Sequence, residues 1–346
     1  MSQEVPTLVE VRRGPIVESR HRGAIIVVTP NSTQVTCLGD PGLVTSTRST
    51  IKPFQALPFI TSGAADRFKA SPREIAIACA SHEGEPIHTQ TVAALLARAG
   101  LDESALRCGA HEPYNVETAA DLKRTGLPFT QLHNNCSGKH AGMLLTAVHR
   151  GLAIDAYYEP EHPVQRAIIS AFARFADLAE DLTTAVDGCS APTFAVPLRS
   201  LALAFARLAN PSSLDSLGDD LTGAASRIVS AMIANPEMVG GTRGRFDTDL
   251  LRASHGKLVC KIGAEAVYGI GVLPSNRFPG GLGIAIKIED GSYRGLGPAV
   301  VETLGSLGVL DGNEIAQLGA YHKPSVENRR GVKVGEVRAV FELKGS

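Results

Sequence analysis

A serine and a lysine stand three positions apart in the stretch Arg48-Ser49-Thr50-Ile51-Lys52. Residues at this spacing fall on one face of a helical turn, so their side chains would be neighbours. A lysine that has lost its proton can accept the proton of the serine hydroxyl, which makes Ser49 a nucleophile without a histidine. Serine acyl-enzymes of the penicillin-recognising type use this Ser-x-x-Lys arrangement. Because a motif of two common residues often arises by chance, it needs partners elsewhere in the chain.

Two later segments supply candidate partners. Lys261-Ile262-Gly263 lies on an expected strand, and Ser81 lies in a polar loop after an expected helix, in the chain order of the penicillin-recognising enzymes. Two ammonium groups close together lower one another's pKa, as does burial, so either Lys52 or Lys261 could be neutral and act as a base. The ordinary alternatives are that Lys261 solubilises an edge strand and that Ser81 is only a polar residue at a helix end.

The cysteines give a second signal. Cys136 and His140 are four residues apart at an expected helix start, and Cys189 lies in a later non-helical break, so the three side chains would make a set of zinc ligands. The spacings match no standard zinc motif, and free cysteines are commonly buried. A core position therefore remains the alternative, and it is the one expected for the others: Cys37, Cys79, Cys108 and Cys260.

Charged residues beside these segments are candidates for substrate binding. The guanidinium of Arg48 could hold a substrate carboxylate bidentately, and Asp187 could orient a substrate ammonium. The alternatives are a surface arginine and a turn residue before Gly188.

Bulk composition excludes several classes of function. The chain has 346 residues with 44% hydrophobic content, a net charge of -1 and a pI of about 6.8, which argues against a nucleic-acid partner. No apolar run is long enough for a membrane span. The N-terminal residues have no apolar secretory core, so we expect a cytoplasmic protein whose cysteines are thiols or metal ligands rather than disulfides.

Hydrophobic patterning predicts strands at both ends of the chain and helices between them. Val-rich and Ile-rich segments predict strands at 7–13, 24–29, 34–38, 258–262, 267–272, 284–288 and 332–343. Helices are predicted at 51–62, from Ser71 onward with a capping box to Glu74, and at 88–98, 139–150, 164–178, 198–208, 221–233 and 300–307. Asp290-Gly291 is expected to be a hairpin turn.

The fold class that follows is α/β, more narrowly α+β. One antiparallel sheet is built from both chain ends, with flanking helices and a helical insertion. The sheet part covers about 1–85 and 240–346 of a single domain, and the helical part covers about 86–239. A cleft between the parts is the expected place for a site.

Several segments together resemble the L-asparaginase II family of rhizobial type. They span nearly the whole chain and are Val44–Gln55, Cys79–His82, His133–His140, Asp187–Cys189 and Lys261–Glu265. The resemblance implies hydrolysis of L-asparagine to L-aspartate and ammonia, by a homodimer with a serine β-lactamase/penicillin-binding-like fold.

The resemblance also implies roles for individual residues. It implies that the Ser49–Lys52 and Ser81–Lys261 pairs catalyse the reaction. A zinc ion is bound by Cys136, Lys139 and Cys189, so Lys139 replaces His140 as a ligand and must be deprotonated. His140 then joins Arg48 and Asp187 as a substrate contact.

Two other functions remain open at this point. The first is a β-lactamase or peptidase that acts on D-Ala-type amides, against which the missing signal peptide counts because such substrates lie outside the cytoplasm. The second is a non-catalytic protein that binds zinc or an amino acid.

Overall fold

The computed structural model describes residues 4–343. The chain forms two compact units. Unit 1 comprises the described residues of Met1–Thr50, Val196–Leu214 and Asp249–Ser346, and unit 2 comprises Ile51–Ala195 and Asp215–Thr248. Residues 51–85, which were expected with the sheet, therefore group with the helical unit.

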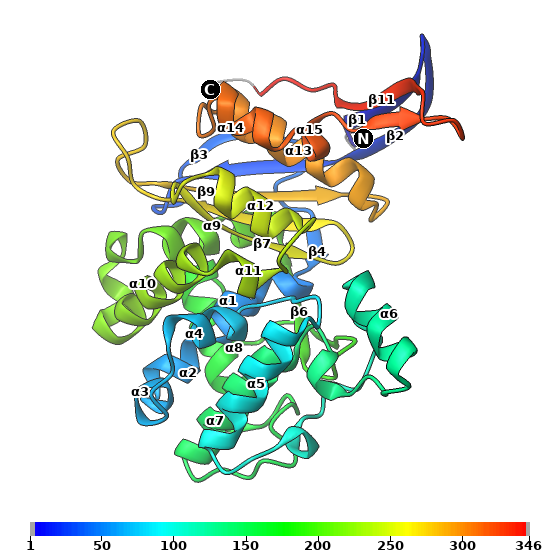
Figure 1. Cartoon of the computed structure of the whole chain (residues 1–346). Coiled ribbons are helices and arrows are strands. Elements are labelled where there is room, and N and C mark those ends of the chain that lie inside the picture. Colours follow the sequence, from blue (N-terminus) through cyan, green and yellow to red (C-terminus); the bar gives the residue numbers. More distant parts are fainter. Residues whose placement is uncertain (1–3, 344–346) are drawn as a thin grey trace. The chain divides into compact units, whose positions relative to one another are not determined.

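Unit 1 is built on an antiparallel sheet with the strand order β10-β11-β1-β2-β9-β8-β7, to which β3 adds by pairing with β2. The strands β1 and β11 come from opposite ends of the chain and run side by side, from Val9 opposite Ala339 to Arg13 opposite Gly335 (Figure 1). The expected antiparallel sheet from both chain ends is thus confirmed. Its strands are β1 (Thr7–Arg13), β2 (Ile16–Val28), β3 (Gln34–Leu38), β7 (Leu258–Gly263), β8 (Val267–Val272), β9 (Leu282–Ile288), β10 (Ser325–Glu327) and β11 (Lys333–Ala339).

Helices α9 (Leu198–Ala209) and α13 (Tyr293–Ser306) cover opposite faces of this sheet. The backbone of α9 comes so close to β9 that a Cβ on Gly283 would lie 1.9 Å from the carbonyl oxygen of Ala202. Gly283 pairs with Val28, and side chains alternate along a strand, so His21 points to the other face. There His21 meets α13, where a Cβ on Gly295 would lie 2.7 Å from the His21 Cβ.

The remaining elements of unit 1 are short. The strand β4 (Val44–Ser46) leads to the 3-10 helix η1 (Arg48–Ile51), while α14 (Gly312–Gln317) and α15 (Gly319–His322) precede β10. The boundary between unit 2, which ends at Thr248, and the last segment of unit 1, which begins at Asp249, lies within the helix α12 (Phe246–Ala253).

Unit 2 is mostly helical. Its helix α4 packs against α5, α7, α10 and α11, and begins with the predicted capping box, in which Ser71 accepts from the Glu74 N–H and Glu74 accepts from the Ser71 N–H. The elements are α1 (Lys52–Gln55), α2 (Leu57–Thr61), α3 (Ala64–Arg67), α4 (Pro72–Ala78), α5 (Pro86–Arg98), α6 (Val116–Thr125), α7 (Ser137–His149), α8 (Pro163–Ala176), α10 (Gly218–Ala234) and α11 (Pro236–Val239), with the strands β5 (Thr184–Val186) and β6 (Pro192–Pro197).

One turn prediction was wrong. Asp290-Gly291 does not join two strands but leads from β9 into α13. The Asp290 carboxylate accepts the N–H of Ser292, and the Ser292 side chain in turn caps α13 by accepting the N–H of Arg294. An aspartate followed by glycine therefore starts a helix here, because a serine cap follows within two residues.

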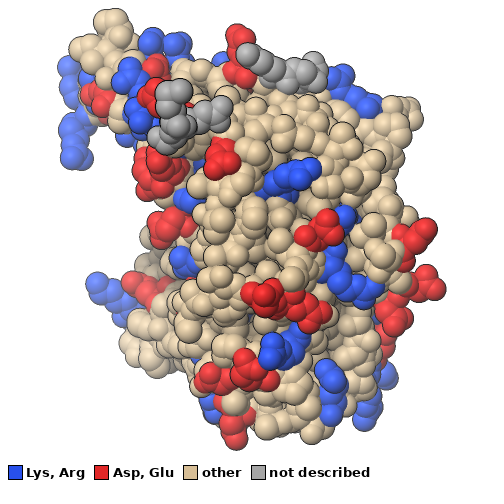
Figure 2. Space-filling view, turned by 180° about the vertical axis from the view of Figure 1, so that it is seen from behind, with Lys and Arg blue, Asp and Glu red and all other residues tan. Residues whose placement is uncertain are grey.

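Within residues 4–343, no helix is long and apolar enough to cross a membrane. Lys and Arg side chains are interspersed with Asp and Glu on the face that Figure 2 shows, which agrees with the nearly neutral composition.

Candidate active site

Ser49 lies on η1, the short 3-10 helix that connects β4 to α1. Its neighbour Thr50 anchors this helix, because the Thr50 hydroxyl donates to the carbonyl of Thr47 over 2.6 Å. Pro53 follows at the start of α1, where its missing N–H has no helical partner to lose. In a 3-10 turn, side chains three residues apart eclipse one another, so the local helix geometry suits the Ser49–Lys52 spacing.

Arg48 has an unusual backbone conformation. Its φ is 45°, in the left-handed region that non-glycine residues rarely adopt. Such conformations persist where the surrounding structure imposes them, and they are frequent at functional sites. The strained residue directly precedes the candidate nucleophile, and its partly buried side chain is the one predicted to bind a carboxylate.

The ammonium group of Lys52 is completely buried and surrounded by oxygen atoms. Its Nζ lies 2.6 Å from the Ala80 carbonyl, 2.9 Å from the Ser81 Oγ and 3.3 Å from the Asn135 carbonyl. A charged amine can donate to all three oxygens, whereas a neutral amine can donate to the two carbonyls and accept the Ser81 proton. The arrangement therefore accommodates both protonation states and connects Lys52 to Ser81 for proton transfer.

The backbone around Ser81 is fixed on both sides. The Ser81 N–H donates to the Val239 carbonyl over 3.0 Å, and the His82 N–H donates to the Asn135 carbonyl over 3.2 Å. The same Asn135 carbonyl accepts from Lys52, so one backbone oxygen joins the loop to the lysine. This role of Asn135 was not predicted from the sequence, because a contact made by a backbone carbonyl does not depend on the type of side chain.

Lys261 lies on β7 in unit 1, completely buried, and so does not solubilise an edge strand. Gly263, two residues later, points the same way because side chains alternate along a strand. A Cβ on Gly263 would lie 3.0 Å from the Thr50 Cγ2 and 3.1 Å from the Thr47 carbonyl oxygen. The side chain of Lys261 therefore leaves β7 on the face that meets the segment carrying Ser49, and Gly263 is needed for this close approach.

A buried sulfur and nitrogen cluster occupies the start of α7 in unit 2. The Lys139 Nζ lies 3.0 Å from the Cys189 Sγ, and both side chains are buried beside Cys136. A hydrogen bond from the Cys136 thiol, together with the Lys139 ammonium, lowers the pKa of Cys189 far below its ordinary value against the effect of burial. Burial lowers the pKa of Lys139, but the Cys189 thiolate more than offsets this and raises it. The contact therefore favours the thiolate form of Cys189 and the ammonium form of Lys139.

This cluster offers two sulfur atoms, a donor type that zinc prefers, and one amine. Lys139 would have to lose a proton when a metal binds. Among residues 4–343, no group of three His, Cys, Asp or Glu side chains is placed to hold a metal.

His140 and Asp187 both lie beside this cluster. The His140 Nδ1 is 2.7 Å from the Tyr157 hydroxyl, and the buried ring also interacts with the Cys189 side chain. Asp187 accepts the Gly188 N–H over 2.7 Å in a turn, as expected of a turn residue, and its charge also raises the pKa of Lys139.

Two buried histidines stack next to Ser81, with ring centroids 4.9 Å apart. In each ring the Nδ1 accepts a backbone N–H, from Gly84 for His82 and from Glu85 for His88. The other nitrogens face the Ser137 hydroxyl and the Glu237 carbonyl. Burial lowers the pKa of both histidines, and for His82 the positive charges nearby add to this effect. Both rings are therefore neutral in the folded protein.

This pair predicts a loss of stability in acid. Above about pH 6.5 the histidines are neutral in both states and contribute no pH dependence. Below it the unfolded chain binds protons that the folded protein binds less readily, so the free energy of unfolding falls, by at most about 1.4 kcal/mol per pH unit for each histidine. The measurement is the free energy of unfolding from urea titrations at pH values from 8 to 5. In His88→Gln its dependence on pH should be weaker, by up to one proton taken up on unfolding. Replacement of the exposed His149 should leave this pH dependence unchanged. An unchanged slope in His88→Gln would contradict the assignment.

Comparison with known proteins places the chain in a family. A sequence model described as L-asparaginase II matches residues 9–339. A comparison with curated proteins finds no match. Among solved structures, a Bacillus glutaminase is 15% identical over 83% of this chain and 91% of that chain, with a TM-score of 0.37. A covalent complex of the Bacillus subtilis glutaminase YbgJ with 5-oxo-L-norleucine is 14% identical over 87% and 93%, with a TM-score of 0.38.

At these TM-scores the structural similarities assign neither a fold nor a substrate. The family match covers almost all of the described chain, and it agrees with the serine and lysine segments found above. The chain belongs to the L-asparaginase II family and is an amidohydrolase of that family.

Proposed function

We propose that the protein hydrolyses L-asparagine to L-aspartate and ammonia through an ester on Ser49. Lys52 takes the proton of the Ser49 hydroxyl, and the Oγ attacks the carbonyl carbon of the substrate's side-chain amide. The C–N bond then breaks, and the proton held by Lys52 passes to the leaving nitrogen, which departs as ammonia. Water attacks the resulting β-aspartyl ester, and its proton returns through Lys52 to Ser49 as aspartate leaves.

The observation that carries this proposal is the environment of Lys52. A completely buried amine with the Ser81 hydroxyl at 2.9 Å and two carbonyls can gain and lose a proton without losing its contacts. This is what a general base must do twice in each turnover. Ser81 and Lys261 complete the mechanism as a second hydroxyl and amine pair that passes protons to or from Lys52.

We assign substrate recognition to Arg48, His140 and Asp187. The α-carboxylate of asparagine needs a cationic partner, which the Arg48 guanidinium supplies, and the α-ammonium needs an acceptor such as the Asp187 carboxylate. His140, whose buried ring lies beside Cys189, is the third residue that we assign to substrate contact.

We further propose that Cys136, Lys139 and Cys189 bind one zinc ion that orders this part of the pocket. The ion would supply a fixed positive charge at the cluster. The three side chains would then hold the start of α7, and Ser49 remains the nucleophile.

Zinc removal is expected to lower stability more than it changes the chemistry. Ligand binding to the folded state stabilises it in proportion to the logarithm of ligand concentration over Kd. Chelation should therefore lower Tm, and Cys189→Ser should abolish zinc binding measured by elemental analysis. Cys79→Ser, at a buried cysteine outside the cluster, is the matched control and should keep one zinc per chain. Protein without zinc, even after refolding with the metal, would contradict the site.

A substrate panel tests the proposed activity. Ammonia release should be fastest with L-asparagine, and nitrocefin should not be hydrolysed. Faster release from L-glutamine would keep the amidohydrolase chemistry but change the substrate. Nitrocefin cleavage would favour the β-lactamase alternative, and asparagine binding without ammonia would favour a non-catalytic binding protein. The proposal includes a homodimer, which light scattering of the same sample tests.

A further inference from the structure

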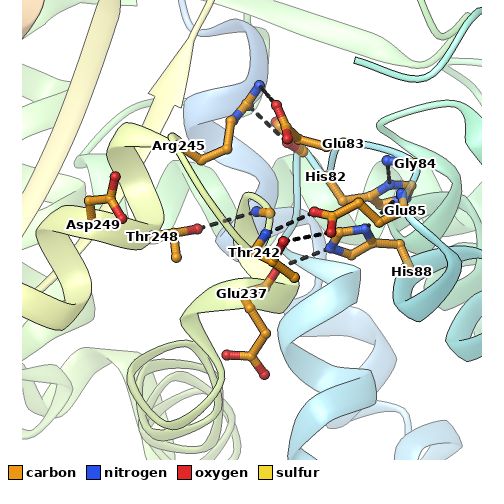
Figure 3. Close-up of polar contacts among 12 residues, drawn as sticks. His82, Glu83, Gly84, Glu85, His88, Glu237, Thr242, Arg245, Thr248 and Asp249 are labelled. Atoms are coloured by element: carbon orange, nitrogen blue, oxygen red, sulfur yellow. Dashed lines mark hydrogen bonds and ion pairs between the residues drawn. The ribbon is translucent and has the colours of Figure 1, made fainter. Parts of the chain in front are cut away.

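A loop of unit 2 lies against the Ser81 segment. This loop, residues 240–245 between α11 and α12, contains Gly240-Gly241-Thr242 and Arg245, and together with the flanking residues Val239 and Thr248 it faces the segment 81–85 (Figure 3). It contacts the Ser81 backbone at both polar groups. The Ser81 N–H donates to the Val239 carbonyl over 3.0 Å, and the Ser81 carbonyl accepts from the Arg245 Nη2 over 3.1 Å. Only the Ser81 side chain is left to face Lys52.

Arg245 is itself held in place by a buried carboxylate. Its Nη1 lies 3.4 Å from the Glu83 Oε1, and the two side chains are 23% and 12% exposed. Burial raises the pKa of Glu83, and the charge of Arg245 counteracts this. The arginine thus bridges a carboxylate and the Ser81 carbonyl, which a planar group with several fixed donors does better than a lysine.

A second carboxylate fixes the other end of the loop. Glu85 accepts the Thr242 N–H over 2.8 Å and the Thr242 hydroxyl over 2.7 Å (Figure 3). The loop is pressed so closely onto this segment that a Cβ on Gly241 would lie 2.8 Å from the Glu83 Cγ. The Gly241 N–H donates to the Thr248 hydroxyl, which donates to the Pro236 carbonyl, so the loop is also braced internally.

We propose that Arg245 is a positioning residue for Ser81. By holding the Ser81 carbonyl, with Glu83 and the Glu85–Thr242 contact as supports, it sets the distance between the Ser81 Oγ and the Lys52 Nζ. The inference rests on the proposed function, in which these two groups exchange protons. A displacement of about 1 Å in such a contact can lower a rate by about 100-fold.

The test compares Arg245→Met with Arg245→Lys and with a control arginine. Arg245→Met should lower kcat by about 10- to 100-fold and leave KM within about threefold, since Arg245 does not contact substrate in this account. Arg245→Lys should recover part of kcat because it keeps the charge and one donor. Arg227→Met removes an exposed arginine paired with Asp66 in the same unit and should match the wild type.

Hydrogen exchange supplies a readout that does not depend on activity. In Arg245→Met the Ser81 amide should exchange about 10-fold faster or more, because the loop that accepts its hydrogen bond is loosened. Arg227→Met should leave this amide unchanged. If wild-type protein released no ammonia from any amide, the proposed function would fail, while the exchange of Ser81 would still decide whether Arg245 holds it.

If Arg245→Met does not fold, the double variant Glu83→Gln/Arg245→Met replaces it in the test. This variant should fold because it leaves no unpaired carboxylate at position 83. It should show the same lower kcat and faster Ser81 exchange. Two results in the folded variant would overturn the proposal. One is a wild-type kcat, and the other is a lower kcat with wild-type hydrogen exchange at the Ser81 amide.

Discussion

Replacing Ser49 with alanine is expected to lower kcat for ammonia release from asparagine by roughly 10⁴- to 10⁶-fold. Loss of a serine nucleophile or of its base removes the covalent route altogether, so Lys52→Ala should fall in the same range. Because the two groups act as one unit, the double variant should be little worse than either single one. The measurement is ammonia production at saturating asparagine, with KM determined for each variant that retains activity.

Stability separates this effect from misfolding. Ser49 is only partly buried, so the free energy of unfolding of Ser49→Ala should lie within about 1 kcal/mol of the wild-type value. Lys52→Ala leaves the buried Ala80 carbonyl without this donor, whereas the Asn135 carbonyl keeps the His82 N–H, so the cost should be about 1–3 kcal/mol. Ser46→Ala, at an exposed serine of the preceding strand, is the control and should keep full activity. Turnover of Ser49→Ala within tenfold of wild type would exclude Ser49 as the nucleophile.

Lys261→Met and Ser81→Ala are expected to lower kcat by about 10²- to 10⁴-fold, the range for loss of a proton-transfer group. Methionine keeps most of the volume of the buried lysine, so the packing of β7 should survive. Ser81→Ala removes the hydroxyl that Lys52 contacts, while the carbonyls of Ala80 and Asn135 remain.

Lys257→Met is the matched control for Lys261. It lies directly before β7 and forms an ion pair with Glu314 over 2.7 Å, with 42% of its side chain exposed. Its partner Glu314 is buried and keeps the Asp311 N–H as a donor, so the replacement should lower stability but should not change kcat. Wild-type kcat in Lys261→Met, together with a lower kcat in Ser81→Ala, would exclude Lys261 from proton transfer. Ser81 would then exchange protons with Lys52 only.

The sequence predicted the regular elements well where the local pattern was strong. The strands 7–13, 34–38 and 267–272 match β1, β3 and β8 residue for residue, because β-branched residues alternate there between clear turns. The start of α4 was also confirmed, since serine, proline and glutamate at fixed offsets specify a helix beginning.

Other elements depended on contacts that the local sequence does not encode. The strand β2 starts at Ile16, eight residues before the prediction, because pairing with β1 extends it through the polar residues Glu18–Arg22. The helix α6 was not predicted as a separate element, and none of its residues is buried. The short strands β5 and β6 form through their mutual pairing.

The candidate site was predicted in its residues but not in all its contacts. Ser49 and Lys52 follow from a spacing rule, and Ser81 and Lys261 from chain order and the family resemblance. The structure adds a direct contact between Lys52 and Ser81, which joins members of two pairs that the sequence treated separately. The supports from Asn135 and Arg245 act through the backbone, where side-chain identity gives no signal.

The assignment of Ser49 as the nucleophile is tested most directly by trapping the ester. Wild-type protein is mixed with asparagine, quenched in acid within one turnover and digested, and the peptides are examined by mass spectrometry. The expected result is an aspartyl group on Ser49, absent in Ser49→Ala and reduced in Lys52→Ala. An ester on Ser81, or rapid ammonia release with no ester on any serine, would contradict it.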